Sequence, residues 1–289
     1  MPDVVGERGY LTGLAFRMLG TIADAEDAVQ ETYIRWYRQS DPERASIESA
    51  RAWLTRVIGR ICLDMLTSAR ARRERYVGPW LPEPVPPHAF APDMGDWPAE
   101  RVTLDDTVST ALLVLLESMT PAERVAFVLH DVFGVPFTEI GEIVGRSPAA
   151  CRQLAVSART RVRRSPARTV SRAEHDRVVR AFATAARSGD MAALIATLDP
   201  DVVARSDGGG RVSAARNPIH GADRVARYLT GALRTMPSVR LADRQTNDGL
   251  GFVLQAEGSV VGVVTLEVDG GVVTQVRLVL NPDKLTLWR

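Results

Sequence analysis

The chain has 289 residues, enough for about two domains, and its 45% hydrophobic and 25% charged residues are ordinary for a globular protein. The net charge of +1 excludes a uniformly basic protein, but eight arginines and no acidic residue fall between Arg146 and Arg172. No apolar run reaches roughly 18 residues and no signal peptide is visible, so we expect a cytoplasmic protein without a membrane span. Cys62 and Cys151 fall in helical patterns, which favours a reducing compartment, and no metal or cofactor is expected.

Helical periodicity and proline content divide the chain into four parts. They are a helical module at residues 1–75, a linker at 76–103, a second helical module at 104–166 and an α+β module at 172–289. Seven prolines between Pro79 and Pro98 exclude a helix in the linker, because proline lacks the amide hydrogen and clashes with the preceding turn. The predicted fold class is therefore multidomain, with two all-α domains followed by an α+β domain.

The first module contains a helix with an acidic face. Thr21 is a suitable N-cap with Asp24 three residues on, and apolar residues from Ile22 to Trp36 recur at helical spacing and predict a buried stripe. The opposite side carries Asp24, Glu26, Asp27, Gln30 and Glu31. Taken alone, this pattern is also explained by a solvated acidic face.

The next helix has the reverse polarity. Apolar residues from Leu54 to Met65 share one face, while Arg51, Arg56 and Arg60 project from another. A basic helix face can neutralise phosphates and gain affinity by releasing counterions, which indicates nucleic acid as a partner. A solvated basic face is the alternative that the pattern leaves open.

Residues 136–163 are predicted to form a helix-turn-helix. Gly145 suits the turn, and Ser147 followed by proline is a favourable start for the second helix. The side chains expected to face DNA are Arg146, Ser147, Arg152, Gln153, Ser157 and Arg159. Arginine and glutamine near the start of such a helix can bind guanine and adenine edges in the major groove, whereas Arg159 suits phosphate contacts. An ordinary helical hairpin is the alternative.

The α+β module is predicted to begin with two or three helices, reaching about Arg234, and to continue with valine-rich strands. The strands are expected at 251–257, 259–269 and 272–280, separated by glycine-containing turns. Four polar residues are candidates for acid–base chemistry, namely Asp207, Arg211, His220 and Asp283. No nucleophile or metal-ligand spacing accompanies them, and His220 follows Asn-Pro in a predicted loop, so catalysis is disfavoured.

Several stretches resemble regions of bacterial RNA polymerase sigma factors of the extracytoplasmic-function type. Leu19–Tyr33 is similar to region 2.2, and Ala52-Trp53-Leu54 with the basic helix that follows is similar to regions 2.3 and 2.4. Leu115–Arg124 resembles the start of region 4, and the helix-turn-helix resembles region 4.2. The resemblance implies two partners, core RNA polymerase through its β′ clamp and β flap, and promoter DNA.

The resemblance also implies a role for each surface. Contacts with the clamp are implied for Asp24, Glu26, Asp27, Gln30 and Glu31. Opening and reading of the −10 element is implied for Arg51, Trp53, Arg56 and Arg60. Recognition of the −35 element is implied for Arg146, Ser147, Arg152, Gln153 and Ser157, with Arg159 on the DNA phosphates.

Three short strings resemble those of a sigma factor subgroup with a fused C-terminal SnoaL-like domain, a member of the cystatin-like α+β cone folds. The strings are Trp80, Leu81, Pro82, Glu83 and Pro84; Asp207, Gly208, Gly209 and Gly210; and Asn281, Pro282, Asp283, Lys284 and Leu285. In that subgroup the extension replaces a separate anti-sigma protein, so the resemblance implies regulatory contacts between domains. A cone of this kind encloses a pocket, which makes a small molecule a further candidate partner.

The expected function is an alternative sigma factor that binds core RNA polymerase, directs promoter recognition and transcription initiation, and is regulated in cis by its C-terminal domain. Two alternatives stay open. One is a one-component helix-turn-helix regulator with a ligand-binding SnoaL-like domain, which would need no contact with core polymerase. The other is a SnoaL-like enzyme fused to a DNA-binding partner.

Overall fold

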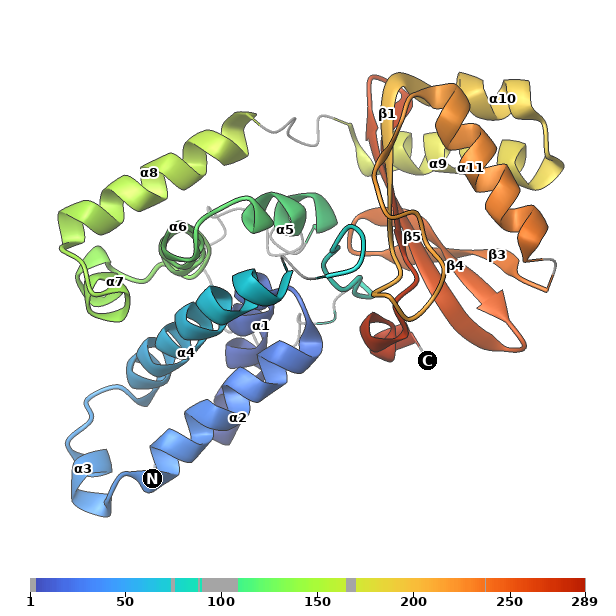
Figure 1. Ribbon diagram of the computed structural model, residues 1–289. Helices are drawn as coiled ribbons and strands as arrows, with labels where there is room; N and C mark the ends of the chain where they lie inside the picture. The colour runs from blue at the N-terminus through green and yellow to red at the C-terminus, as the bar shows by residue number, and fades with distance from the viewer. Residues whose placement is uncertain are drawn as a thin grey trace. The chain divides into compact units, whose positions relative to one another are not determined.

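The computed structural model describes residues 4–73, 76–87, 89, 109–164, 170–236 and 238–288. Its contacts divide the chain into two compact units (Figure 1). Met1–Glu74 and His88–Ser165 form the first, and Arg75–Pro87 and Pro166–Arg289 form the second. The beginning of the predicted linker therefore belongs with the C-terminal residues. Most of its remainder, 88–103, lies outside the described residues.

The first unit begins with helices that share an apolar core. They are a 3-10 turn at Val5–Glu7, α1 at Arg8–Leu19, α2 at Ile22–Arg38, α3 at Asp41–Ala45 and α4 at Ala50–Arg73. Thr21 caps α2 by accepting a hydrogen bond from the Asp24 amide, as the sequence predicts. Leu14, Leu54 and Ile58 are fully buried in this core.

The same unit continues with the helices of the second predicted module. They are α5 at Thr110–Glu117, α6 at Pro121–Phe127, a π-helical turn at Val128–Val132, α7 at Phe137–Val144 and α8 at Pro148–Arg164. Gly145 ends α7 with a left-handed φ of 70°, which glycine adopts without steric cost. Ser147 accepts a hydrogen bond from the Ala150 amide at 3.2 Å, so α8 starts at the predicted cap.

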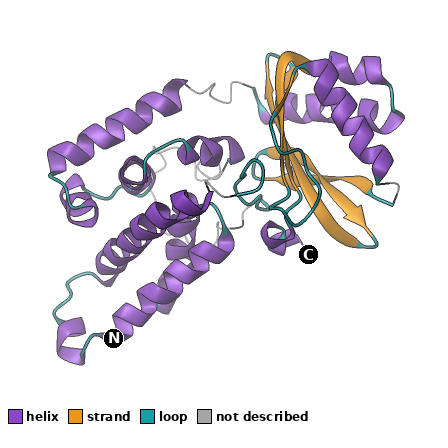
Figure 2. Cartoon of the chain, in the orientation of Figure 1, coloured by secondary structure: helices purple, strands orange, loops and turns teal. Residues whose placement is uncertain are grey.

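The C-terminal unit packs helices against a six-stranded sheet (Figure 2). Its elements are α9 at Arg172–Ser188, α10 at Met191–Ala196, β1 at Leu198–Asp207, β2 at Ile219–His220, α11 at Ala222–Thr235, β3 at Arg240–Thr246, β4 at Gly249–Ala256, β5 at Ser259–Asp269 and β6 at Val272–Val279. Two short 3-10 turns follow, at Pro282–Lys284 and Thr286–Trp288. The strand order is β2-β1-β6-β5-β4-β3, in which β1 and β6 are parallel and the other pairs are antiparallel.

The position of β1 corrects the prediction that helices alone precede Arg234. Its buried residues alternate at Val202, Ala204 and Ser206, which places every second side chain on the helix-covered face of the sheet. The strand pairs with β6, about 70 residues further along the chain, so no turn near β1 marks it in the sequence. His220 was expected in a loop, but it lies in β2 and pairs with Val203 of β1.

Both faces of the central strands are buried. The helix-covered face contributes Phe252, Val264 and Val276 to the main apolar cluster, together with residues of α9 and α11. Val253 and Val263 point to the opposite face and are also fully buried. The linker segment 76–87 belongs to this unit, and its Leu81 and Val85 are each only 1% exposed.

Candidate functional site

The acidic face of α2 is largely open to solvent. The Asp24 carboxylate accepts a hydrogen bond from the Thr21 hydroxyl at 2.7 Å at the start of the helix. Glu31 forms an ion pair with Arg35 at 2.8 Å. Glu26, Asp27 and Gln30 are exposed.

Two apolar side chains that the sequence prediction missed extend this face. Ile34 and Tyr37 are 39% and 59% exposed, and at helical spacing they continue the row formed by Asp27 and Gln30. Exposed apolar residues in a polar surround are typical of protein contact surfaces.

The basic residues of α4 make contacts inside the first unit. Arg51 donates to Glu7 at 2.7 Å and lies over the Tyr10 ring, 4.8 Å from its centroid. Arg56 lies 3.1 Å from the Glu142 carboxylate, and Arg60 is 3.4 Å from carbonyl oxygens near the C-terminal end of α7. The carbonyl end of a helix carries partial negative charge, which favours these guanidinium groups. The predicted −10 surface therefore meets the helix-turn-helix within this unit.

Trp53, the aromatic member of the predicted −10 surface, is half-buried. Its ring packs edge-on against Trp36, with 5.2 Å between the ring centroids. The contact fixes the first turns of α4 against α2.

The predicted −35 residues divide into two groups. Arg146, Ser147, Arg152 and Gln153 are exposed, and the Arg152 guanidinium lies 5.4 Å from the Phe137 ring centroid. Ser157, expected to face outward, is instead half-buried and donates a hydrogen bond to Glu123 at 2.7 Å. Arg159 pairs with Asp131 at 2.6 Å. Helix α8 packs against α6, and this packing turns the Ser157 position toward the unit's interior.

Glu123 acts as a hydrogen-bond acceptor at this helix contact. Burial opposes its ionisation, but hydrogen bonds from Ser157 and from the amide and hydroxyl of Thr120 outweigh burial and lower its pKa. The Thr120–Glu123 pair is a capping box that starts α6. Ser157 thus has a structural partner.

In the C-terminal unit the three strings that the sequence analysis singled out come together. The Asp207 carboxylate is fully buried and accepts hydrogen bonds from the Tyr76 hydroxyl at 2.6 Å and the Leu81 amide at 2.8 Å. The Lys284 ammonium lies 2.7 Å from the same carboxylate and 2.5 Å from the Leu81 carbonyl oxygen. We call Tyr76, Leu81, Asp207, Asn281 and Lys284 the linker dock.

Aromatic rings complete the surroundings of Lys284. The ammonium lies 4.0 Å from the Trp80 ring centroid and 5.2 Å from that of Tyr76, distances at which a cation is attracted to the ring face. The Asn281 amide group donates to the Tyr76 hydroxyl at 2.9 Å. Burial raises the pKa of Tyr76, and its hydrogen bond to Asp207 raises it further, so the hydroxyl stays a donor.

The rest of the linker string is held by the end of the chain. Thr286 donates to Glu83 at 3.1 Å, and the Trp288 indole donates to the Pro84 carbonyl oxygen at 2.8 Å. The sequence prediction missed Tyr76, Thr286 and Trp288. Tyr76 lies shortly before the string 80–84, and Trp288 lies shortly after the string 281–285. This closeness in sequence is the signal that could have identified the two aromatic residues.

Two features of the glycine string explain its composition. Gly209 has a φ of +60°, and a Cβ there would overlap the Asn281 carboxamide, so the backbone of this turn can approach the dock only with glycine.

The last two members of the terminal string to be placed differ in burial. Asp283 is exposed and pairs with the exposed Arg211 at 3.3 Å, whereas Leu285 is only 2% exposed.

A cavity of about 810 Å³ lies within the same unit. Its lining comes from α9, α11, the strands β3 to β6 and the segment Ser213–Ala215. Asp207, Arg211, His220 and Asp283, the candidates for acid–base chemistry, are absent from the lining. Among the described residues no group of three histidine, cysteine or acidic side chains is placed to hold a metal ion.

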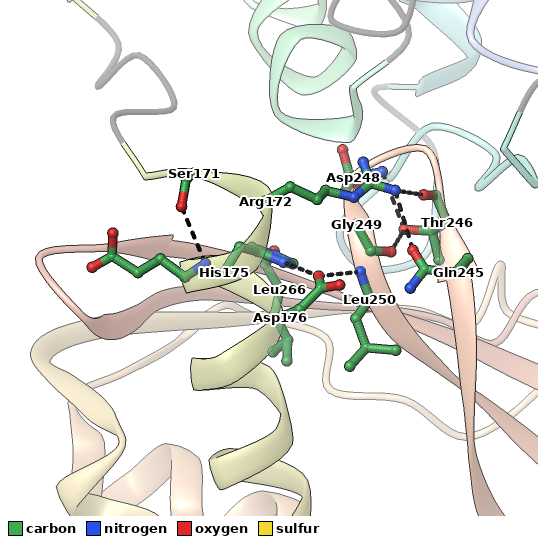
Figure 3. Close-up of polar contacts among 11 residues, drawn as sticks. Ser171, Arg172, His175, Asp176, Gln245, Thr246, Asp248, Gly249, Leu250 and Leu266 are labelled. Carbon is green, nitrogen blue, oxygen red and sulfur yellow. Dashed lines mark hydrogen bonds and ion pairs between the residues drawn. The ribbon is translucent and has the colours of Figure 1, made fainter.

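A polar cluster joins the start of α9 to the sheet (Figure 3). The buried His175 lies 3.1 Å from the Leu266 carbonyl oxygen and 3.2 Å from Asp176, which also accepts the Leu250 amide at 3.0 Å. Arg172 donates to Gln245 at 3.1 Å. These contacts tie α9 to β3, β4 and β5 and are structural.

No helix in the described part of the chain is long and apolar enough to cross a bilayer.

Comparison with known proteins agrees with this arrangement. The family model "Sigma-70 region 2" matches residues 6–72, and "Sigma-70, region 4" matches residues 109–162. The chain is 38% identical to the ECF RNA polymerase sigma factor SigJ of Mycobacterium tuberculosis, over 96% of this chain and 91% of that protein. It is also 38% identical to the probable ECF RNA polymerase sigma factor SigI of the same species, over 96% and 92%.

A solved structure extends the similarity to the whole fold. The crystal structure of Mycobacterium tuberculosis SigJ matches with a TM-score of 0.69 and 33% identity, covering 96% of this chain and 95% of that one. The predicted fold class, two helical sigma regions followed by a SnoaL-like α+β domain, is confirmed. The chain belongs to the extracytoplasmic-function family of RNA polymerase sigma factors.

Proposed function

We propose that this protein binds core RNA polymerase, directs it to specific promoters, and is regulated in cis by its C-terminal unit through the linker dock. The proposed regulation rests on the hydrogen bonds that hold the main chain of Leu81. Its amide donates to Asp207 and its carbonyl oxygen accepts from Lys284, so both main-chain groups of one linker residue are held by a buried ion pair.

The exposed face of α2 is the proposed contact with the β′ clamp. Glu26, Asp27 and Gln30 would supply polar contacts, and Ile34 and Tyr37 would supply apolar area. Asp24 and Glu31 have partners within α2 and its cap, so their contribution would be electrostatic. Contact with the β flap is assigned to the region 4 helices.

Promoter contacts are assigned to α4 and α8. Arg51, Trp53, Arg56 and Arg60 would act at −10, and Arg146, Ser147, Arg152 and Gln153 would act at −35. Arg56 and Glu142 are both exposed, and an exposed ion pair contributes only about 0–1 kcal/mol. DNA phosphates can therefore displace Glu142 from Arg56 at little cost.

The linker dock acts on the segment that joins the two sigma regions. The chain from Arg73, at the end of α4, to Thr110, at the start of α5, includes the docked residues 76–87. Holding this segment limits the separations available to regions 2 and 4, and releasing it widens them. A two-state dock would thereby shift the sigma factor between arrangements of different activity.

The protein is proposed to act in the cytoplasm without a cofactor or metal, and no catalysis is assigned to the C-terminal unit. The cavity is proposed as a small-molecule site, since it is bordered by apolar side chains and not by the acid–base candidates.

Run-off transcription with purified core polymerase tests the proposal. Template-specific RNA that requires the protein would support the sigma function. A Gly209→Ala variant, which displaces Asn281, should change the yield, and Gly270→Ala, at a turn with open space, should not. An equal yield from wild type and Gly209→Ala would overturn regulation through the dock. DNA binding without any RNA would overturn the sigma function in favour of a one-component regulator.

A further inference from the structure

The lining of the cavity defines the chemistry of what fits inside it. Its volume, about 810 Å³, lies within the roughly 300–1,000 Å³ of small-molecule sites. Most lining side chains are aliphatic or aromatic, among them Phe182, Phe252 and Leu278. Arg227 is the one charged residue in the described lining, and its guanidinium is already held by Asp223 through two hydrogen bonds of 2.8 and 3.1 Å. Because that guanidinium is 71% exposed and lies on the solvent side of the lining, a charged group buried among the apolar side chains would lose its hydration without gaining a counter-charge.

The described lining contains three hydroxyl side chains, Ser213, Thr235 and Tyr228, and that of Tyr228 is paired with a buried hydroxyl group. The Tyr228 hydroxyl lies 2.7 Å from the Ser206 hydroxyl, and Ser206 is only 1% exposed. A single hydrogen bond between two hydroxyl groups uses one of their two hydrogens, so the pair retains hydrogen-bonding capacity. A hydroxyl or carbonyl group on an otherwise apolar ligand would match it.

Three segments connect the cavity to the linker dock: two belong to the cavity wall, and β1 reaches it through the contact of Ser206 with the lining residue Tyr228. Ser206 faces the helix-covered side of β1, and the next residue, Asp207, holds the linker from the opposite side. Leu278 and Leu280 line the cavity just before Asn281, and the Leu280 and Asn281 amides both bond the Asp207 carbonyl oxygen.

The third segment begins at the glycine string. Ser213–Ala215 line the cavity, and the same loop lies against the linker, because a Cβ on Gly210 would be 3.3 Å from Val77. The end of β6 and the loop Ser213–Ala215 each have one side on the cavity and the other on the dock, and β1 contacts the lining residue Tyr228. A change in the position of the wall is therefore a change in the position of the residues that hold the linker.

We infer that the cavity binds an uncharged, largely apolar small molecule with one hydroxyl or carbonyl group, and that the bound molecule strengthens the hold of the linker dock. A ligand packed against Leu278, Leu280 and Ala214 restrains the wall, and the restraint passes to Asp207 and Asn281. Because coupling between two sites is reciprocal, a docked linker also raises the affinity for the ligand. The ligand site stands on the cavity alone, while its regulatory meaning rests on the proposed function.

Three fluorescent probes of the same shape test the ligand class on the full-length protein. We expect 1-hydroxypyrene to bind with one site per chain, and pyrene-1-sulfonate to bind at least about tenfold more weakly. Tyr228→Phe should remove the advantage of 1-hydroxypyrene over pyrene. Ala232→Trp and, as a milder filling, Ala186→Leu place extra volume in the cavity and should abolish or weaken binding. Arg224→Trp, on an exposed site of the same helix, is the matched control.

Binding outside the cavity, shown by equal affinity of wild type and both filled variants that retain native circular dichroism, would overturn the site. So would the absence of binding by any of the three probes, or tighter binding of the sulfonate.

Hydrogen exchange measures the coupling. The Leu81 amide donates to Asp207, so 1-hydroxypyrene should slow exchange in the peptide spanning Val77–Val85 by about fivefold or more. Asp207→Asn should weaken probe binding by a similar factor. Unchanged exchange with the probe bound would overturn the coupling.

Run-off transcription separates the ligand site from the proposed regulation. A transcriptional response to Gly209→Ala without any probe binding would remove only the ligand site. Probe binding without a transcriptional response to Gly209→Ala would remove only the regulation.

Discussion

The Lys284 ammonium and the Asp207 carboxylate lie 2.7 Å apart, and their side chains are 5% and 0% exposed. Neither charge is hydrated, so each depends on the other and on the hydrogen bonds around it. Leu81 supplies two of those bonds from the linker main chain. The ion pair and the docked linker are therefore one cooperative structure, and loss of either partner should release the other.

Removing one partner of this pair should be strongly destabilising. Lys284→Met leaves the Asp207 charge buried and uncompensated, which costs about 3–5 kcal/mol. Urea denaturation of Lys284→Met, Asp207→Asn and the double variant should show that the double loss is well below the sum of the single losses. Arg211→Ala, which breaks the exposed pair with Asp283, is the control and should change the free energy of unfolding by less than about 1 kcal/mol. Additive losses would contradict the pairing.

Gly209 and Gly270 form a matched pair of backbone positions. Their φ angles are +60° and +55°, so alanine carries a similar left-handed penalty of about 1–2 kcal/mol at both. Only at Gly209 does the added Cβ overlap another residue, Asn281. Gly209→Ala should therefore lose more stability than Gly270→Ala and accelerate hydrogen exchange in Val77–Val85. Equal stability losses and unchanged exchange would show that the turn does not support the dock.

Charge reversal at the start of α8 tests the −35 assignment. Arg152 is exposed near the first turn, where a side chain of a recognition helix reaches base edges. Arg152→Glu should weaken binding to a cognate −35 fragment by about 1–3 kcal/mol, roughly 5- to 150-fold, as measured by fluorescence anisotropy at fixed salt. Arg216→Glu makes the same change of net charge at an exposed site in the C-terminal unit. Similar losses from both reversals would indicate a general charge effect and remove Arg152 from the recognition surface.

Asp176 should make the stability of the C-terminal unit depend on pH. Burial opposes its ionisation, but hydrogen bonds from the Leu250 amide and from His175 outweigh burial and hold its pKa below the usual value. A carboxyl whose pKa is lowered by folding contributes stability above its unfolded pKa of about 3.9, and this contribution is lost as the pH falls toward the folded value.

The measurement compares wild type with Asp176→Asn by urea denaturation between about pH 3 and pH 7. The difference between them should be largest at neutral pH and shrink below about pH 4. Asp201→Asn, at an exposed site of β1, serves as the control. A difference that stays constant over the whole range would contradict a charged Asp176 at the start of α9.

The sequence by itself determined the family, the order of the modules and the local starts of the helices. Caps such as Thr21 and Ser147, the glycine turn at Gly145 and the linker prolines act over a few residues, so they can be identified without knowing the fold. The same short-range signals gave the outward positions of Arg152 and Gln153, which the structure leaves exposed.

Only the tertiary structure decided which distant residues meet. β1 was missed because its parallel partner β6 lies far along the chain, and the outward prediction for Ser157 was wrong because α6 packs on that side of α8. The dock joins Tyr76, Asp207 and Lys284, whose separations in sequence exceed any local periodicity. Burial is a property of the assembled fold, and burial is what turns these ordinary polar side chains into a specific ion pair that grips the linker.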